Sequence, residues 1–314
     1  MLQVSKSLSE IAVLRGGKKD FKQSLEEGVE IMQSLTKLGY RPLDVLIDTD
    51  GNWTSKGKPT DAHHIFTIAH TVVDTTRSKG EKYQELAKKM QIPLLFSQGQ
   101  DVHMDREDMY RILRQQGIKV PDTFVIRANA PLKDDIFRDM WLKLHTPLLV
   151  RPLTQNENAP SRLIKLFSDL ENVIRDYHSK GVDMHILTYK KAPTLSLALL
   201  PNFRNQALYT PLWVETFAVA NELPHKDSVV RPHLHAPQVH KDAMKDLANK
   251  VFRALDLKGP ALIDVINYKG THIVVNIDTT PSLRKDGRFV QSLETTGVEA
   301  GHDIHTKIQH DLER

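Results

Sequence analysis

The sequence contains no cysteine, and this absence excludes disulfide bonds and thiol chemistry. It also lacks a strong charge excess, because 43 lysine and arginine residues face 39 aspartate and glutamate residues. No basic block is long enough for a nucleic-acid arm, so the surplus favours at most a small anionic ligand. No apolar run approaches the length of a membrane span, and residues 1–6 lack the apolar stretch of a signal peptide. A soluble, cytoplasmic protein is therefore expected.

The 314 residues are enough for two or three compact units. In the first hundred, apolar segments expected to form strands alternate with helical patterns: strands at 11–14, 44–48, 65–69 and 93–96, helices at 21–35 and 81–90. Such alternation over short connections predicts a doubly wound parallel sheet. The first helix is predicted from apolar residues at helical spacing, namely Phe21, Leu25, Val29, Met32 and Leu35.

The organisation changes near residue 100. Helices are expected at 105–116, 133–144 and 168–177, and strands at 120–126, 147–152, 163–166 and 183–189. From residue 120 onward this β-α-β-β-α-β order predicts a compact, open-faced α+β unit. Arg151 lies within one of the apolar strands, where a charge needs a partner.

The last part of the chain contains a predicted β-hairpin. It follows expected strands at 194–200 and 207–217 and a helix at 241–255, and it precedes expected helices at 288–296 and 302–312. The hairpin consists of strands at 261–266 and 272–277 around a turn at 267–270. Strand alternation allows Asp264, Asn276 and Asp278 to point to one face, where two carboxylates and an amide suit Mg²⁺. The alternative is a solvated edge hairpin whose acids face water.

With these elements in order, the chain resembles D-alanine–D-alanine ligases of the ATP-grasp superfamily over nearly its whole length. The resemblance rests on IAVLRGG at 11–17 with SL at 24–25, MDR at 104–106, QGIKVP at 116–121, LVRP at 149–152, ALDLKGPALID at 254–264 and NIDTTP at 276–281. The order and spacing of these motifs are more specific than any one of them.

The resemblance implies a three-domain ATP-grasp architecture that combines α/β and α+β parts. The expected units are an N-terminal α/β domain at 1–100, a central ATP-grasp subdomain at 101–190 and a C-terminal subdomain at 191–314 that carries the hairpin. Nucleotide is then expected between the second and third units. The family is commonly dimeric through its first domain, which implies a homodimer.

The family's reaction consumes ATP: it phosphorylates one D-alanine carboxylate, and the amine of a second D-alanine attacks the acyl phosphate. Arg106 and Arg151 match the two lysines that contact the ATP phosphates, so both charges are kept with the planar fork of arginine. For Arg106 the alternative is a surface ion pair. Asp264, Asn276 and Asp278 match the metal ligands, with acid and amide exchanged between the last two positions.

Other positions that match functional residues of the family differ in chemistry. The loop at 153–161 stands where the family has a glycine-rich flap, yet no glycine occurs between Gly117 and Gly181. This loop is a poor phosphate cradle, because residues other than glycine resist positive φ and proline lacks a donor. The stretch matching the adenine-binding hinge includes Thr188, Tyr189 and Lys190, with Thr188 and Tyr189 in place of an acid and a lysine.

Two further replacements affect the reaction itself. Leu262 stands where the family has the arginine that stabilises the oxyanion, and loss of one such donor typically lowers a rate by about 10²–10³. The glutamate that binds the substrate amine is replaced near Lys22, which reverses the charge.

Three hypotheses follow. The first is a degenerate ligase that keeps the fold and a binding or scaffold role without ligating D-alanine, and the combined losses favour it. The second is an active ligase that uses ATP and Mg²⁺ on D-alanine or another amino acid. The third is an anion- or nucleic-acid-binding protein that uses the small basic surplus.

Overall fold

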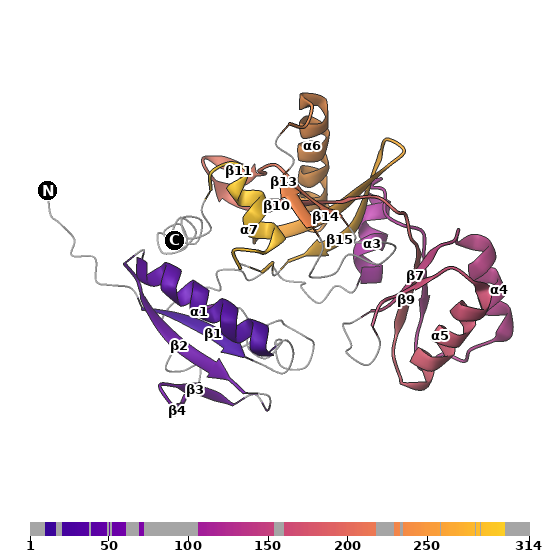
Figure 1. Cartoon of the computed structure of the whole chain (residues 1–314), viewed down its shortest axis with the longest axis horizontal. Coiled ribbons are helices and arrows are strands. Elements are labelled where there is room, and N and C mark those ends of the chain that lie inside the picture. Colours follow the sequence, from indigo (N-terminus) through magenta and orange to yellow (C-terminus); the bar gives the residue numbers. More distant parts are fainter. Residues whose placement is uncertain are drawn as a thin grey trace, which may run out of the picture.

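The computed structural model describes residues 10–16, 21–37, 39–48, 50, 52–60, 69–71, 106–153, 160–217, 229–232, 235–257, 259–279, 281–282 and 284–298. Strands in these residues form three sheets, one from each successive part of the chain (Figure 1). The elements predicted at 81–90, 93–96 and 302–312 lie outside this part, as do residues 65–68 of another predicted strand. None of the described helices has the length and apolar character needed to cross a membrane.

The first sheet has the order β4-β3-β2-β1-β5. Its strands are β1 (Glu10–Gly16), β2 (Arg41–Ile47), β3 (Trp53–Ser55), β4 (Lys58–Thr60) and β5 (Ala69–Thr71). β1 pairs in parallel with β2 and β5, but β3 and β4 are antiparallel. The predicted parallel pairing is confirmed for β1, β2 and β5, and β3 and β4 are antiparallel strands that were not predicted. They are three residues each, too short for a readable alternation, and join through Lys56 and Gly57 at positive φ.

Helix α1 (Phe21–Lys37) packs on β1 and β2, with a buried face different from the predicted one. Ser24, Glu27, Ile31 and Leu35 are buried, whereas Val29 is 39% exposed. The spacing of the buried residues is helical. The apolar pattern misplaced this face because two of its members are polar.

The central sheet is antiparallel, in the order β6-β9-β7-β8. Its elements are β6 (Thr123–Ile126), α4 (Asp134–Lys143), β7 (Leu148–Pro152), β8 (Arg162–Ile164), α5 (Phe167–Ser179) and β9 (Met184–Thr188). The predicted β-α-β-β-α-β order is confirmed. Both helices pack on this sheet around buried residues such as Phe137, Met140 and Ile174.

The third sheet has the order β13-β12-β10-β14-β15, and β11 pairs with β10 beside this path. Its strands are β10 (Thr194–Phe203), β11 (Gln206–Tyr209), β12 (Val214–Phe217), β13 (Val229–Pro232), β14 (Ala261–Tyr268) and β15 (Thr271–Asp278). The single strand predicted at 207–217 is wrong, because it divides into β11 and β12. Pro211 lies in the gap, where it has no amide N–H to continue a ladder.

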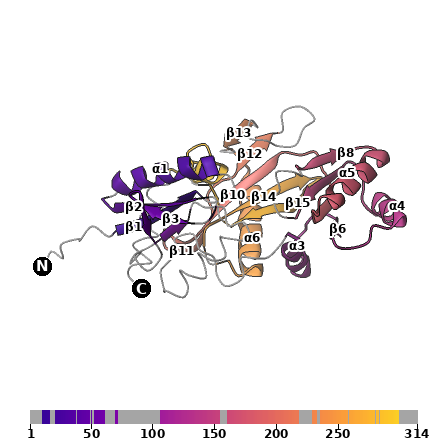
Figure 2. The ribbon, with the colours of Figure 1, turned by 90° about the horizontal axis from the view of Figure 1, so that it is seen from below.

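Helices cover both faces of the third sheet. Helices α3 (Arg106–Gln115) and α6 (Gln238–Ala254) lie side by side on one face, as Figure 2 shows. Helix α7 (Arg288–Glu294) packs on the other face, where Phe289 and Val290 contact a cluster that contains Leu262. Odd-numbered residues of β14 therefore face α3 and α6, and even-numbered residues near Leu262 face α7.

The predicted hairpin is formed by β14 and β15, with a two-residue turn at Lys269 and Gly270, both at positive φ. β14 is an inner strand and residues 261–266 are buried, so the edge-hairpin alternative is wrong for this strand. The register shifts between Asp264 and Val265, which leaves Val275 without an opposite residue on β14.

Candidate functional site

The two strands of the hairpin bring the three predicted metal ligands to one face. Asp264 lies opposite Asn276, and Leu262 lies opposite Asp278. Residues directly opposite on paired strands share a face, as do residues two apart on one strand. The register thus places Asp264, Asn276 and Asp278 together, while their role as metal ligands stays a prediction.

The carboxylate of Asp264 is engaged by three side chains. Asp264 is only 5% exposed. Its Oδ1 accepts hydrogen bonds from Ser196 Oγ at 2.6 Å and from Arg288 Nη1 at 2.7 Å. Its Oδ2 accepts one from Asn276 Nδ2 at 3.3 Å, and Arg288 Nη1 also lies 3.0 Å from Ser196 Oγ. This buried acid therefore has a cation and two neutral donors as partners.

Arg288 reaches this carboxylate because of the turn before α7. The N–H of Gly287 donates to the carbonyl of Arg284 at 2.8 Å. A Cβ at Gly287 would lie 3.0 Å from that oxygen and 3.1 Å from the carbonyl oxygen of Ser282. A glycine therefore allows the close turn. The next residues, Phe289 and Val290, anchor α7 in the core and thereby fix the position of Arg288.

Leu262 lies in the same apolar cluster as Phe289 and Val290. The position where the resemblance implies an oxyanion-stabilising arginine is thus part of the core. A guanidinium does reach the neighbouring Asp264, but from α7 instead of β14.

The predicted phosphate-binding residues come from two elements. Arg106 is the first residue of α3, and Arg151 lies in β7. Arg151 Nη2 donates to Tyr110 Oη at 2.9 Å, and this hydroxyl donates to the carbonyl of Val275 at the register shift. Arg151 Nε is buried and has no hydrogen-bond partner among the described residues. The buried Tyr110 therefore links the central sheet to the hairpin.

Arg106 is in an environment that disfavours its charge. Burial and the neighbouring charge of Arg151 lower its pKa to about 10, against an opposing effect of Tyr110 and Asp278. Its Nη1 lies 3.5 Å from the carbonyl oxygen of Pro152, too long for a strong hydrogen bond. Arg151 and Asp278 both influence Arg106, so these three predicted residues are neighbours. In the described part of the chain Arg106 forms no ion pair, so the surface ion pair considered for it has no support there.

The predicted hinge residues lie at the end of β9 and directly after it. Thr188 ends β9 and is buried, and its Oγ1 has no hydrogen-bond partner in the described part. The N–H of Tyr189 donates to the carbonyl of Pro147 at 2.8 Å, and burial raises the pKa of its phenol. Lys190 Nζ lies 4.5 Å from the ring centroid of Tyr268. Of these three residues, Lys190 contacts the hairpin, through Tyr268.

A carboxylate from the first sheet's helix also approaches the third unit. Glu27 is buried in α1 and accepts a hydrogen bond from Ser282 Oγ. Beside it, Arg284 Nη1 lies 3.0 Å from Glu26 Oε2. Lys22, near the position of the family's amine-binding glutamate, is exposed. Two glutamates of α1, Glu26 and Glu27, thus contact residues of the third unit, and the charge reversal near Lys22 stays a prediction.

Sequence reasoning missed Glu27, Tyr110 and Arg288 as members of the site. A polar residue on the buried face of α1 was the available signal for Glu27. Tyr110 and Arg288 belong to short helices, and nothing in their local pattern indicates partners on β15 and β14.

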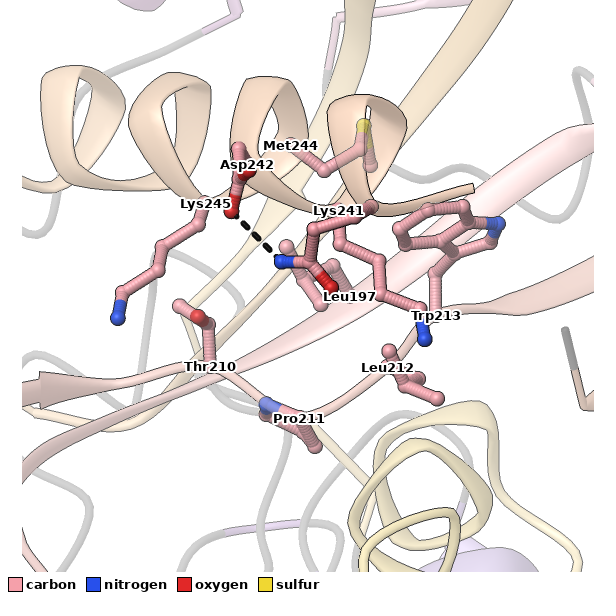
Figure 3. Close-up of a pocket in the computed structure, with 10 residues that line it drawn as sticks. Leu197, Thr210, Pro211, Leu212, Trp213, Lys241, Asp242, Met244 and Lys245 are labelled. Carbon is pink, nitrogen blue, oxygen red and sulfur yellow. Dashed lines mark hydrogen bonds between the residues drawn. The ribbon is translucent and has the colours of Figure 1, made fainter. Parts of the chain in front are cut away.

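A separate pocket of about 150 Å³ lies between α6 and residues 210–213 (Figure 3). Its lining residues Leu197, Trp213 and Met244 belong to the cluster on the α3 and α6 face. Asp264 contacts α7 on the opposite face, so this pocket is distinct from the predicted site.

The candidate site contains donors for an anion as well as oxygen ligands for a cation. No group of three or more histidine, aspartate or glutamate side chains in the described residues is arranged to hold a metal ion. Two adjacent guanidiniums, in contrast, suit a phosphate group, which accepts bidentate hydrogen bonds. Residues 154–159 of the glycine-free loop lie outside the described residues.

Comparisons with known proteins agree on one family. The family model described as "D-ala D-ala ligase C-terminus" matches residues 112–309. A D-alanine–D-alanine ligase of Desulforudis audaxviator is 25% identical over 301 residues, which cover 92% of this chain and 94% of that protein.

The solved structures show the same fold. D-alanyl-alanine synthetase A of Vibrio cholerae has a TM-score of 0.80 at 14% identity, covering 98% of this chain and 99% of that one. D-alanine–D-alanine ligase of Bacillus anthracis complexed with ATP has a TM-score of 0.75 at 16% identity, covering 97% of each chain.

Proposed function

Because the chain belongs to the D-alanine–D-alanine ligase family and has its three-domain ATP-grasp fold, we propose that it binds a nucleotide without ligating D-alanine. The observation that carries this proposal is the pair of arginines, Arg106 and Arg151, beside the hairpin. Burial, and after it the repulsion by Arg151, lower the pKa of Arg106 to about 10. A bound phosphate would relieve this repulsion.

Three further features support a phosphate ligand at this place. Arg106 begins α3, where the positive end of the helix dipole adds to the two guanidinium charges. Arg151 keeps a buried Nε donor that no described residue accepts from. Both arginines lie between the central sheet and the third sheet, where the resemblance implies a nucleotide.

The residues of β14 that face α7 support the proposal that the protein does not ligate D-alanine. Leu262 has no side-chain donor for an oxyanion, and it lies in the same apolar cluster as Phe289. The predicted metal ligand Asp264 is already paired with Arg288 at 2.7 Å. The arginine charge expected at position 262 is thus absent, and the carboxylate charge of Asp264 is already paired.

Thermal unfolding with ATP tests the nucleotide part. We expect wild-type stabilisation of about 2.7 kcal/mol at a hundredfold excess over Kd. Arg106→Met should lose this effect. Arg111→Met should keep it, because Arg111 is an exposed residue of the same helix that pairs with Asp108. No stabilisation of the wild type at millimolar ATP would contradict nucleotide binding.

Phosphate release tests the second part. With ATP and D-alanine, we expect no release above that of a protein-free control. Release that depends on D-alanine would contradict the proposal even if the thermal experiment succeeds.

One observation favours a second candidate, a ligase for another amino acid. Glu27 presents a buried carboxylate beside Ser282, and such a group can bind a substrate amine. A panel of D- and L-amino acids in the phosphate-release experiment tests this candidate. Any activity should fall in Glu27→Gln and persist in Glu30→Gln, an exposed glutamate of the same helix. No observation of comparable strength in the described residues favours nucleic-acid binding.

A further inference from the structure

We propose that the guanidinium of Arg288 takes the place of a metal ion at Asp264, so that this centre contains a built-in cation and does not bind Mg²⁺. The inference concerns the metal alone and holds whether or not a nucleotide binds. It departs from the metal role predicted for Asp264, Asn276 and Asp278.

The first reason is that three donors already occupy the carboxylate of Asp264. Oδ1 accepts from Ser196 Oγ and Arg288 Nη1, at 2.6 and 2.7 Å. Oδ2 accepts from the amide nitrogen of Asn276. A carboxylate can only accept, so Asn276 must turn its NH₂ group toward it. The amide oxygen needed for a hard cation then does not point at the shared position.

The second reason is that both acids of the predicted metal set are close to arginines. Asp264 forms an ion pair with Arg288. Asp278 acts on Arg106 and opposes the lowering of its pKa. A divalent cation at these acids would face like charges from two sides, which disfavours its binding.

The third reason is that the Arg288 contact is built into the fold. The buried carboxylate of Asp264 cannot be solvated by water and needs a compensating charge. The turn at Gly287 and the packing of Phe289 hold Arg288 where it provides that charge. A third of its side chain stays exposed, at 35%, so the pair forms without enclosing the whole guanidinium.

Titration with Mn²⁺, which accepts the same oxygen ligands as Mg²⁺, tests the inference directly by electron paramagnetic resonance of the free ion. We expect the wild type to show no site tighter than about 1 mM. Asp264→Asn should behave identically. A wild-type site that disappears in Asp264→Asn would overturn the proposal, and this pair of measurements requires no change at Arg288.

Removal of the guanidinium provides the complementary test. Arg288→Met should expose the Asp264 carboxylate and gain a Mn²⁺ site at least about tenfold tighter than the wild-type limit. Adding Asp264→Asn to this variant should abolish the gain. Arg284→Met, which removes an arginine paired with Asp286 and Glu26, should bind like the wild type.

The variants remain informative if folding is affected. Circular dichroism and thermal unfolding would establish that Arg288→Met is folded, and Arg288→Gln replaces it if it is not. A folded variant without Arg288 that gains no Mn²⁺ site would contradict the proposal. Because nucleotide is absent throughout, failure here leaves the proposed nucleotide binding untouched.

Discussion

The arginines on the two sides of the hairpin face opposite electrostatic surroundings. Arg288, on the α7 side, is paired at 2.7 Å with the buried carboxylate of Asp264. Arg106 and Arg151 repel each other, with Asp278 as a partial counter-charge to Arg106. Arg288 thus compensates a buried charge of the folded protein, whereas Arg106 and Arg151 are the pair for which we propose an anionic ligand. The same residue type has different consequences because its partners come from different elements.

The largest effect is expected from breaking the compensated pair. Asp264→Asn keeps the shape of the side chain but leaves Arg288 without its counter-charge, and we expect a loss of about 3 kcal/mol in the free energy of unfolding. Urea denaturation at neutral pH measures this loss. The control is Asp286→Asn, which removes an exposed partner of Arg284 and should cost less than about 1 kcal/mol. Equal losses in the two variants would mean that the buried ion pair of Asp264 and Arg288 contributes no more to stability than an exposed one.

The same substitution should have opposite signs on the two sides. Without ligand, Arg106→Met is expected to raise the free energy of unfolding by about 1 kcal/mol, since it removes a poorly solvated and repelled charge. Arg288→Met is expected to lower it by about 2 kcal/mol, since it leaves the carboxylate of Asp264 uncompensated. Urea denaturation of both variants and the wild type measures these two changes. A marked destabilisation by Arg106→Met would contradict the expected difference in sign between the two substitutions.

The stability advantage of Arg106→Met, which is its higher free energy of unfolding relative to the wild type, should also depend on pH. The folded-state pKa of Arg106 is lowered to about 10, below its ordinary value. Below that pH the cost of its charge is fully present. Above it the unfolded chain holds a proton that the folded chain has released, so wild-type stability from this group rises with pH. The advantage should be constant from pH 7 to about pH 9 and shrink above about pH 10. Urea denaturation of both proteins across this range measures it, and an advantage that grows would contradict the lowered pKa.

A fourth cation, Lys190, offers the smallest effect. Lys190 Nζ lies over the ring of Tyr268, 4.5 Å from its centroid. Lys190→Met should lower the free energy of unfolding by about 0.5 kcal/mol, the usual size of such a contact near the surface. Lys269→Met is the matched control, because Lys269 Nζ is farther from the same ring, at 5.5 Å. Equal losses in the free energy of unfolding for both variants in urea denaturation would contradict a stabilising contact between Lys190 and Tyr268.

Local patterns predicted several elements correctly. The β-α-β-β-α-β order of the central unit could be predicted because its apolar runs are separated by clear breaks. The hairpin could be predicted from its strands and from the turn residues Lys269 and Gly270. Elements without such patterns were missed, as with β3 and β4, or merged, as with β11 and β12.

The site was predictable only where residues share one local element. Strand alternation sufficed to place Asp264 near Asn276 and Asp278, because pairing across a short hairpin follows from the chain itself. It did not reveal that Tyr110 links Arg151 to β15, since these three elements are distant in sequence. The buried face of α1 was misjudged because Glu27 is polar, although Ser282 compensates its burial.

By itself, the sequence determined the family, the ATP-grasp architecture and the positions of the acids on the hairpin. Periodicity and turn chemistry are local properties, and the order of motifs follows from their positions along the chain. The partners of those acids were decided by the tertiary structure alone. Ser196, Asp264 and Arg288 meet only when β10, β14 and α7 pack together. Which charge is compensated depends on such long-range contacts, because the identity of a residue in the sequence does not indicate its partners in the folded protein.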